Sequence, residues 1–419
     1  MKLKTTITSH YPALASRDFV IFWVGQFTSL IGTWMQNTTQ PYLAYRISGR
    51  PLDLGLIGFA ATLPTLLLAL PAGVIVERLD KRKLVIWMQV VALLQAFTLA
   101  ILTFTGLIQI WHIVVLSFVL GVAGAFEITA RQAMIIELVG RESLPNALAL
   151  QSTAFNLARI LGPALAAPFM VVLGDQGEGW VFLANGVSYF FVMAGLFFVR
   201  TPFKAQVVAT TKNWLAEFRE GQSYILQNSV LSMIILMAGI TGFIGLPFLQ
   251  QIPAIARDLL AQPADTDALV ATRNSLLYTF QGVGALIASF LIASQNSKHK
   301  GRVLFIGQMT FIVGLLVIGL THNAGFAYFL LMMIGWGSVS QLAMMNILVQ
   351  TNVIDNLRGR VFSTYLWALQ GVAPFGSLLI GGLAQNWGIG PTAVVGGGLC
   401  LLVVGGLHFL KPELRRQTI

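Results

Sequence analysis

The chain has 419 residues, of which 56% are hydrophobic and only 10% are charged. Globular proteins carry roughly 25% charged residues, so this composition excludes a soluble enzyme, a disordered chain and a disulfide scaffold, and it selects an integral membrane protein. The net charge of +10 resides in short joins between apolar runs. It therefore indicates membrane topology and contact with anionic lipid headgroups rather than binding of nucleic acid.

Twelve apolar runs are long enough to cross a membrane, because a spanning helix needs about 20 mostly apolar residues. In chain order they lie at 18–45, 53–76, 83–105, 109–137, 144–173, 179–199, 229–256, 268–294, 302–321, 324–351, 359–385 and 390–410. The pattern predicts an all-α integral membrane protein with twelve transmembrane helices in two six-helix bundles.

One join, 200–228, is much longer than the others. It divides the chain into a six-helix half at 1–200, a linker at 201–228 and a second six-helix half at 229–419. The linker carries apolar residues at near-helical spacing with charged residues between them, which predicts an amphipathic helix on the inner membrane surface. We expect it to act as a connector rather than as a regulatory element.

The basic residues set the orientation. With the N-terminus inside, twenty of the 26 Lys and Arg residues lie in joins on that side, and four, Arg46, Arg50, Arg257 and Arg273, lie on the other. The positive-inside rule then predicts that both termini are cytoplasmic.

No metal or cofactor site is expected from the residue types. The chain has one cysteine, Cys400, and its five histidines are scattered without an i, i+4 pair. No Gly-x4-Gly-Lys-Ser/Thr phosphate loop occurs either. We therefore expect no metal, no cofactor, no ATP as fuel and no enzyme activity.

The join between the second and third runs carries a family signature. Gly73, Glu77, Arg78, Lys81 and Arg82 resemble the signature loop of the major facilitator superfamily, with Glu77 in place of an Asp and Asp80 in place of a second Gly. Residues 140–147 and 355–361 are similar to the branch of that superfamily that contains the enterobactin exporter and related bacterial efflux proteins. The resemblance covers essentially the whole chain.

The resemblance implies an inner gate at these joins. Besides the five signature residues, the corresponding gate positions of this chain are Glu137, Asp355, Arg358 and Arg360. We expect the Glu77 carboxylate to face the positive start of the eleventh helix. The lysines of the loop can instead serve only to enforce topology.

The fifth run resembles the helix motif of exporters in this superfamily. The motif positions read Ala158, Gly162, Pro163 and Ala166, so alanines stand where the family has glycines. Small residues allow helices to approach closely. The run is interpreted either as the occluding helix of an exporter or as a generic packing face.

Three charged residues lie inside predicted spans, where a charge is costly and tends to be paired or functional. Glu127 and Arg131 are four residues apart on one helix face, so they can pair. Glu127 is the only acid well inside a run and is the candidate proton carrier; a static ion pair or direct contact with the solute are the alternatives. Arg159 either competes for Glu127 or extends to the inner headgroups.

Neutral polar residues mark the runs that line the pathway in this superfamily. These cavity candidates are Gln36, Asn37, Gln40, Gln250, Gln341, Asn346, Tyr365, Trp367 and Gln370. Such a cavity would suit a bulky amphiphilic solute. For any one of these residues, hydrogen bonding between helices is the alternative role.

These observations predict a monomeric, proton-coupled exporter of a siderophore-like or drug-like amphiphile in a bacterial inner membrane, working by alternating access. Its partners would be the small-molecule solute, protons and membrane lipids. A lipid or lysolipid flippase of the same fold and a facilitated transporter without proton coupling remain open alternatives.

Overall fold

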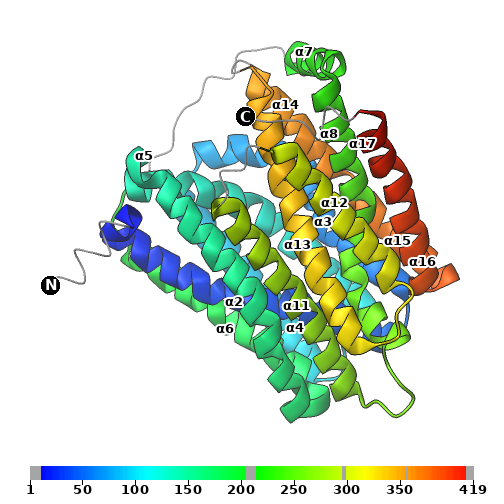
Figure 1. Cartoon of the computed structure of the whole chain (residues 1–419). Coiled ribbons are helices and arrows are strands. Elements are labelled where there is room, and N and C mark those ends of the chain that lie inside the picture. Colours follow the sequence, from blue (N-terminus) through cyan, green and yellow to red (C-terminus); the bar gives the residue numbers. More distant parts are fainter. Residues whose placement is uncertain (1–10, 204–213, 295–298, 355–356, 412–419) are drawn as a thin grey trace. The chain divides into compact units, whose positions relative to one another are not determined.

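A computed structural model describes residues 11–203, 214–294, 299–354 and 357–411 (Figure 1). Within these ranges the regular structure is helical, with no strand. The first contact unit comprises Met1–Leu43 and Leu63–Ala209, and the second comprises Ala44–Thr62 and Thr210–Ile419. Residues 44–62 therefore belong to the second unit although they precede the linker, and the predicted boundary at residue 200 stays a prediction.

The helices before the linker follow the predicted runs. They are η1 (Pro12–Ala15), α2 (Arg17–Ser48), α3 (Pro51–Arg78), α4 (Lys81–Phe104), α5 (Ile110–Leu173), η2 (Gly174–Gln176) and α6 (Gly177–Phe198). In the first unit, α4 packs against both α5 and α6 (Figure 1).

After the linker helix α7 (Trp214–Gln227), the seventh run is divided into short helical segments. They are α8 (Ser229–Ile240), η3 (Thr241–Gly245), α9 (Leu246–Phe248), η4 (Leu249–Gln251), α10 (Ile252–Ala254) and η5 (Ile255–Leu259). Pro247 and Pro253 lie at the starts of α9 and α10, where the missing N–H of proline interrupts the regular hydrogen-bond ladder.

The remaining helices also match the predicted runs. They are α11 (Asp267–Ser294), α12 (Lys300–Ile318), α13 (Ala324–Thr351), α14 (Arg358–Leu366), η7 (Trp367–Gly371), α15 (Ala373–Trp387), α16 (Ile389–Cys400), η8 (Leu401–Gly405) and α17 (Gly406–Leu410). Helix α13 packs against α11 and α12 in the second unit. Gly284 and Gly335 allow close contact there, since an added Cβ would lie 1.8 and 2.0 Å from backbone oxygens of the neighbouring helix.

Two glycines lie where one helical segment ends and the next begins directly after it in the chain. Gly140 has φ +72° inside α5, and Gly174 has φ +53° at its end. Glycine reaches this left-handed region at little cost, so Gly140 divides α5 into a first arm (110–139) and a second arm (141–173). The predicted fourth and fifth spans correspond to these two arms.

The described residues contain nine stretches that are long and apolar enough to cross a membrane. One of them, Ile110–Phe198, contains three helices, the two arms of α5 and α6. Helix α2 has 32 residues, which is long enough to span a membrane, but its composition is too polar for it to be among these nine. The fold is therefore the all-α membrane fold with twelve spanning helices that the sequence predicts.

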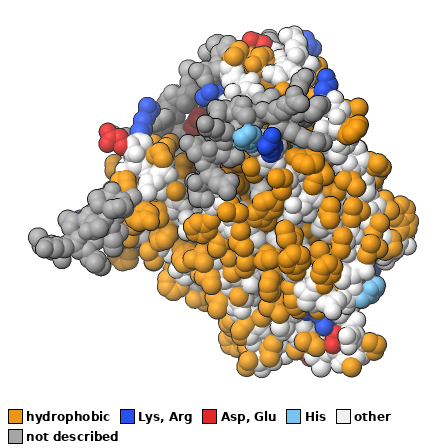
Figure 2. Space-filling view, viewed as in Figure 1, with side chains coloured by type: hydrophobic (Ala, Val, Ile, Leu, Met, Phe, Trp, Pro, Cys, Tyr) orange, Lys and Arg blue, Asp and Glu red, His pale blue; other side chains and the backbone are white. Residues whose placement is uncertain are grey.

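The surface of the helices supports this assignment. Figure 2 shows mostly hydrophobic side chains on the visible face, with the few charged ones toward its upper and lower margins. Large apolar side chains are exposed along the helices, among them Val172, Phe197 and Phe290. Contiguous exposed apolar surface of this kind is suited to lipid and not to water.

A hydrophobic cluster holds one end of the first unit together. Phe19 and Phe22 of α2 are fully buried with Met134 and Ile135 of the first arm of α5 and Leu196 of α6. Burying such side chains contributes about 1.5–3 kcal/mol each. The cluster fixes α2 against both arms of α5, and this contact positions the candidate site.

The linker helix is attached to the second unit. The Gln222 amide donates to Thr364 Oγ1 of α14 at 2.8 Å, and Gly221 approaches Arg360 of the same helix. These contacts attach α7 to α14, and the connecting role of the linker stays a prediction.

Candidate functional site

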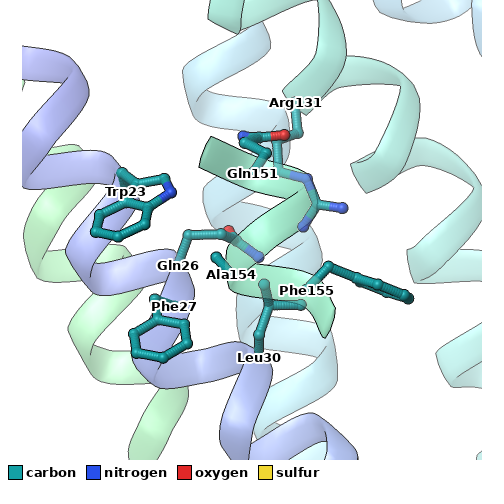
Figure 3. Close-up of a pocket in the computed structure, with 8 residues that line it drawn as sticks. All are labelled: Trp23, Gln26, Phe27, Leu30, Arg131, Gln151, Ala154 and Phe155. Carbon is teal, nitrogen blue, oxygen red and sulfur yellow. The ribbon is translucent and has the colours of Figure 1, made fainter. Parts of the chain in front are cut away.

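A pocket lies in the first unit between α2 and the two arms of α5 (Figure 3). It is lined by Trp23, Gln26, Phe27, Leu30, Arg131, Gln151, Ala154 and Phe155. The space inside it that a water-sized sphere can occupy is about 60 Å³, and the pocket is partly open to the surroundings. Figure 3 shows polar groups of Gln26, Arg131 and Gln151 pointing into the same space, with aromatic rings on both sides. We call this hollow the arginine pocket.

Glu127 and Arg131 form the ion pair that their spacing predicts. Arg131 Nη1 donates to Glu127 Oε1 at 3.1 Å, and the two side chains are 19% and 16% exposed. The pair lies one helical turn apart on the first arm of α5. At this partial burial, the attraction between the charges is screened less than at an open surface, so the pair holds Arg131 at the wall of the pocket.

The Arg159 side chain contacts an aromatic ring in the described structure. Its guanidinium carbon lies 5.5 Å from the ring centre of Trp34, a cation–π contact. Trp34 in turn meets the ring of Phe155 edge-on, with 5.4 Å between the ring centres. In the described part of the chain, no carboxylate lies within ion-pair distance of Arg159, and its Nε has no hydrogen-bond partner.

Two amides of the pocket are also incompletely paired. Gln26 is 6% exposed, and among the described residues neither its Oε1 nor Gln151 Nε2 has a hydrogen-bond partner. Buried polar atoms are nearly always hydrogen-bonded. Both atoms are themselves enclosed by protein, so a ligand or water in the pocket would reach them only after a local rearrangement of side chains.

The small residues of the exporter-like motif form a close contact with α2. Ala158 and Ala166 are fully buried, and a Cβ added to Gly162 would lie 2.4 Å from Trp34 Cβ. Pro163 is buried beside them. The contacts establish a close packing face; whether the helix also occludes the pathway stays a prediction.

A second polar cluster on α2 consists of amides and a hydroxyl, and we call it the amide network. Gln36 Nε2 donates to Gln40 Oε1 at 3.1 Å and to Gln95 Oε1 at 3.0 Å, while its own oxygen accepts from Asn185 at 2.7 Å. Gln40 donates to Ser117 Oγ at 2.6 Å. These contacts favour the alternative role of Gln36 and Gln40, hydrogen bonding between helices.

The other cavity candidates differ in their exposure. Asn37, Trp367 and Gln370 are exposed, Gln250 and Asn346 are half-buried, and Gln341 and Tyr365 are buried. Gln341 accepts a hydrogen bond from Thr241 at 3.3 Å, Gln350 donates to Asn346 at 2.6 Å, and Gln250 lies against Gly58. A solute role for these residues stays a prediction.

The signature loop forms specific contacts inside the first unit. Lys81 Nζ lies 2.6 Å from Glu137 Oε1, and the Lys81 side chain is 5% exposed. Asp80, which replaces the family glycine, caps α4 by accepting from the Lys83 amide. Lys81 therefore does more than enforce topology, because a buried ammonium requires its partner.

Arg82 completes this end of the unit. Its guanidinium donates to Phe197 O at 2.8 Å and to Val199 O at 3.0 Å. These carbonyls lie at the C-terminal end of α6, where orphan acceptors and the negative end of the helix dipole favour a cation. Gly73 is half-buried, and Glu77 and Arg78 are exposed in the described structure, so their gate role stays a prediction.

The matching join of the second unit is only partly described. Asp355 lies outside the described residues. Arg360 pairs with Glu220 of α7, and Arg358 begins α14. The pairing of a gate position with the linker helix was not predicted, because no pattern in the sequence indicates which helix α7 contacts.

Sequence reasoning also missed a polar pair in the second unit. The Tyr45 hydroxyl donates to Asp258 Oδ2. The seventh run was predicted to end at residue 256, but η5 continues to Leu259 and places Asp258 within the helix. The end of the helix could not be located from the sequence, since the charged Arg257 and Asp258 look like the start of a join.

The sequence profile of a family described as transmembrane secretion effectors, within the major facilitator superfamily, matches residues 8–418. The chain belongs to this family. Its members are transporters and not enzymes, as the sequence predicts. The chain is accordingly a multi-pass membrane protein.

Similarity to individual proteins agrees with this membership. The chain is 24% identical to the staphyloferrin A transporter of Staphylococcus aureus, covering 94% of this chain and 96% of that protein. It is 23% identical to the macrolide efflux protein A of Streptococcus pyogenes, covering 92% and 94%. The crystal structure of the nucleoside transporter NupG superposes with a TM-score of 0.69 at 11% identity, covering 94% of this chain and 99% of that one. The last similarity concerns the fold alone.

Proposed function

We propose that this chain is a proton-coupled exporter of an amphiphilic small molecule, acting in a bacterial inner membrane with both termini cytoplasmic. The relatives support export, since their names assign efflux or siderophore transport to them. The excess of Lys and Arg on one side of the predicted spans supports the orientation. Alternating access of two six-helix halves would carry the solute across.

The observation that carries the coupling proposal is the Glu127–Arg131 ion pair beside the arginine pocket. An ionised Glu127 holds Arg131 in the pair. Protonation of Glu127 would remove the attraction and release the Arg131 guanidinium, so the charge and shape of the pocket wall would change with the proton. A carrier that takes up a proton on one side and the solute on the other would exchange them.

The energy available is sufficient for such exchange. One proton moving down a potential of 100 mV supplies about 2.3 kcal/mol. This corresponds to roughly a fifty-fold concentration gradient of solute. No nucleotide would be needed as fuel.

The proposal is tested with Glu127→Gln in proteoliposomes carrying an imposed pH gradient. We expect this variant to lose uphill transport while it still folds and binds solute, because the amide keeps the shape of the side chain and cannot take up a proton. Glu142→Gln is the matched control, since Glu142 is an exposed acid in the bend of the same helix. Full uphill transport by Glu127→Gln would contradict the proton role and leave Glu127–Arg131 as a static pair.

A compound panel in pump-deficient cells identifies the solute class. Lower retention of a catecholate, dye or amphiphilic antibiotic in cells expressing the chain, reversed by a protonophore, would support gradient-driven export. An unchanged panel together with translocation of labelled lysolipid would support the flippase alternative instead.

A further inference from the structure

The arginine pocket and its surroundings carry one positive charge in excess. Glu127 neutralises Arg131. Arg159, one helical turn beyond Phe155 on the same arm of α5, has no carboxylate partner among the described residues. A charge within a membrane span is costly unless it is compensated, and the Trp34 ring compensates Arg159 only in part.

Hydrogen-bond donors also outnumber acceptors there. Arg131 gives one of its five N–H donors to Glu127, and Arg159 Nε and Gln151 Nε2 have no partner within the described ranges. The one unpaired acceptor among these pocket groups, as far as the structure describes them, is Gln26 Oε1. A ligand that satisfies the site must therefore present acceptor atoms, and a negative charge on them would balance the excess cation.

The walls supply flat apolar surface beside these donors. Trp23 and Phe27 stand on one side of the pocket and Phe155 on the other (Figure 3). The edge-to-face contact of Phe155 with Trp34 continues the aromatic surface as far as Arg159. An aromatic ring placed beside these side chains would put a substituent of its own next to Arg131, which lines the pocket, with Arg159 at the far end of the same aromatic surface.

We infer that the arginine pocket binds the carboxylate, or an equivalent anionic group, of an aromatic amphiphile, with Arg131 and Arg159 on the anion and the aromatic side chains on the ring. The inference rests on the proposed function, because it names the class of solute that the exporter takes.

The test uses three fluorescent amphiphiles that share one ring system and differ in charge: dansylglycine as the anion, dansylglycinamide as the neutral analogue and dansylcadaverine as the cation. Their binding to the purified full-length chain in nonionic detergent is followed by the dansyl fluorescence. We expect dansylglycine to bind about tenfold more tightly than the amide, since hydrogen bonds to charged groups are the strong ones, and we expect dansylcadaverine to bind most weakly.

Arg159→Gln separates the inference from a structural role of the arginines. We expect this variant to lose the preference for dansylglycine while its affinity for the amide stays unchanged. Arg141→Gln is the matched control, because it removes the same charge from an exposed position in the bend of α5 and should keep the preference. If Arg159→Gln does not fold, the double variant Glu127→Gln, Arg131→Gln removes the paired arginine without leaving an unpaired acid, and it should also reduce the preference.

The possible outcomes are distinct. Equal binding of dansylglycine and its amide, tighter binding of the cation, or a preference that persists in Arg159→Gln would overturn the inference. The same probes in proteoliposomes test export separately. An anion preference without export would leave the inference supported and contradict the proposed exporter, whereas export without the preference would do the reverse.

Discussion

Two buried glutamines of α2 lie in different polar clusters of the first unit, and they differ in whether their side-chain oxygens are hydrogen-bonded. Gln36, in the amide network, uses both its amide nitrogen and its oxygen in contacts with three other helical side chains. Gln26, ten residues earlier, has an oxygen in the arginine pocket that no described residue pairs. Both residues are almost fully buried, so burial alone does not distinguish them.

The difference separates two uses of a polar residue in a membrane helix. Hydrogen bonds such as those of Gln36 stabilise the packing of helices, because their polar atoms have no better partner in the apolar surroundings, although Gln95 Nε2 at the edge of the network has no partner among the described residues. Buried polar atoms beside a hollow, such as Gln26 Oε1, would gain a partner only if the surrounding side chains rearranged to admit one. The two glutamines are therefore distinguished by which of their atoms are unpaired, and not by their residue type.

The largest effect is expected from Gln36→Leu, which removes the central residue of the amide network. The substitution removes three hydrogen bonds and leaves polar atoms of Gln95 and Asn185 without this partner. At about 0.6–1.7 kcal/mol for each hydrogen bond between membrane helices, we expect the free energy of unfolding to fall by about 2–3 kcal/mol. Reversible unfolding in mixed micelles measures it. An unchanged stability would mean that the network does not hold the helices together.

Gln26→Leu in the arginine pocket is expected to have a smaller effect on the free energy of unfolding, and one of opposite sign. Gln26→Leu removes a buried oxygen that has no partner in the described structure, and relief of such a group is neutral or stabilising. We expect the free energy of unfolding to rise by no more than about 1 kcal/mol. The same unfolding assay measures it. A loss of stability as large as that of Gln36→Leu would remove the distinction between the clusters.

The smallest effect is expected on the pH dependence of stability, where the charged carboxyl of Asp265 differs from the neutral amides of the amide network. Asp265 lies in the join before α11, and hydrogen bonds from the Gln262 amide and from Arg273 lower the pKa of its carboxyl. Because the pKa is lower in the folded chain, this contribution to stability is complete above pH of about 4 and is lost as the pH falls through the folded value.

The amide network contains no group that titrates in that range. The stability of Asp265→Asn should therefore fall less on acidification below pH of about 4 than the stability of the unsubstituted chain does. Gln36→Leu should instead lower stability by the same amount at each pH. Thermal unfolding between about pH 3 and pH 6 compares the variants. An acid profile of Asp265→Asn identical to that of the unsubstituted chain would contradict the role of this carboxyl.

The same pattern of completed and incomplete contacts explains what could be predicted at the site. The Glu127–Arg131 pair follows from the i, i+4 spacing, which fixes the distance between side chains on one helix. Arg159 could be recognised as a buried charge, but its contact with Trp34 depends on how α5 packs against α2. The residues that complete the amide network, Gln95, Asn185 and Ser117, belong to other helices, and no periodicity indicates their proximity.

The sequence by itself determined the class of the protein, the positions of its spanning helices and its family. Long apolar runs can satisfy their backbone in lipid only as helices, so their positions follow from composition. The signature loop and the joins then indicate the superfamily. These features are local, and each one is contained in a short stretch of the chain.

Only the tertiary structure decided which polar groups are satisfied and which face a hollow. Gly140 turns α5 back on itself, and the bend brings Gln151 and Phe155 of its second arm to the pocket beside Arg131 of its first arm. Residues distant in sequence become partners through packing, and the free energy of a buried polar atom depends on those partners. For that reason the helices could be located from the sequence, whereas the arginine pocket could be found only in the folded chain.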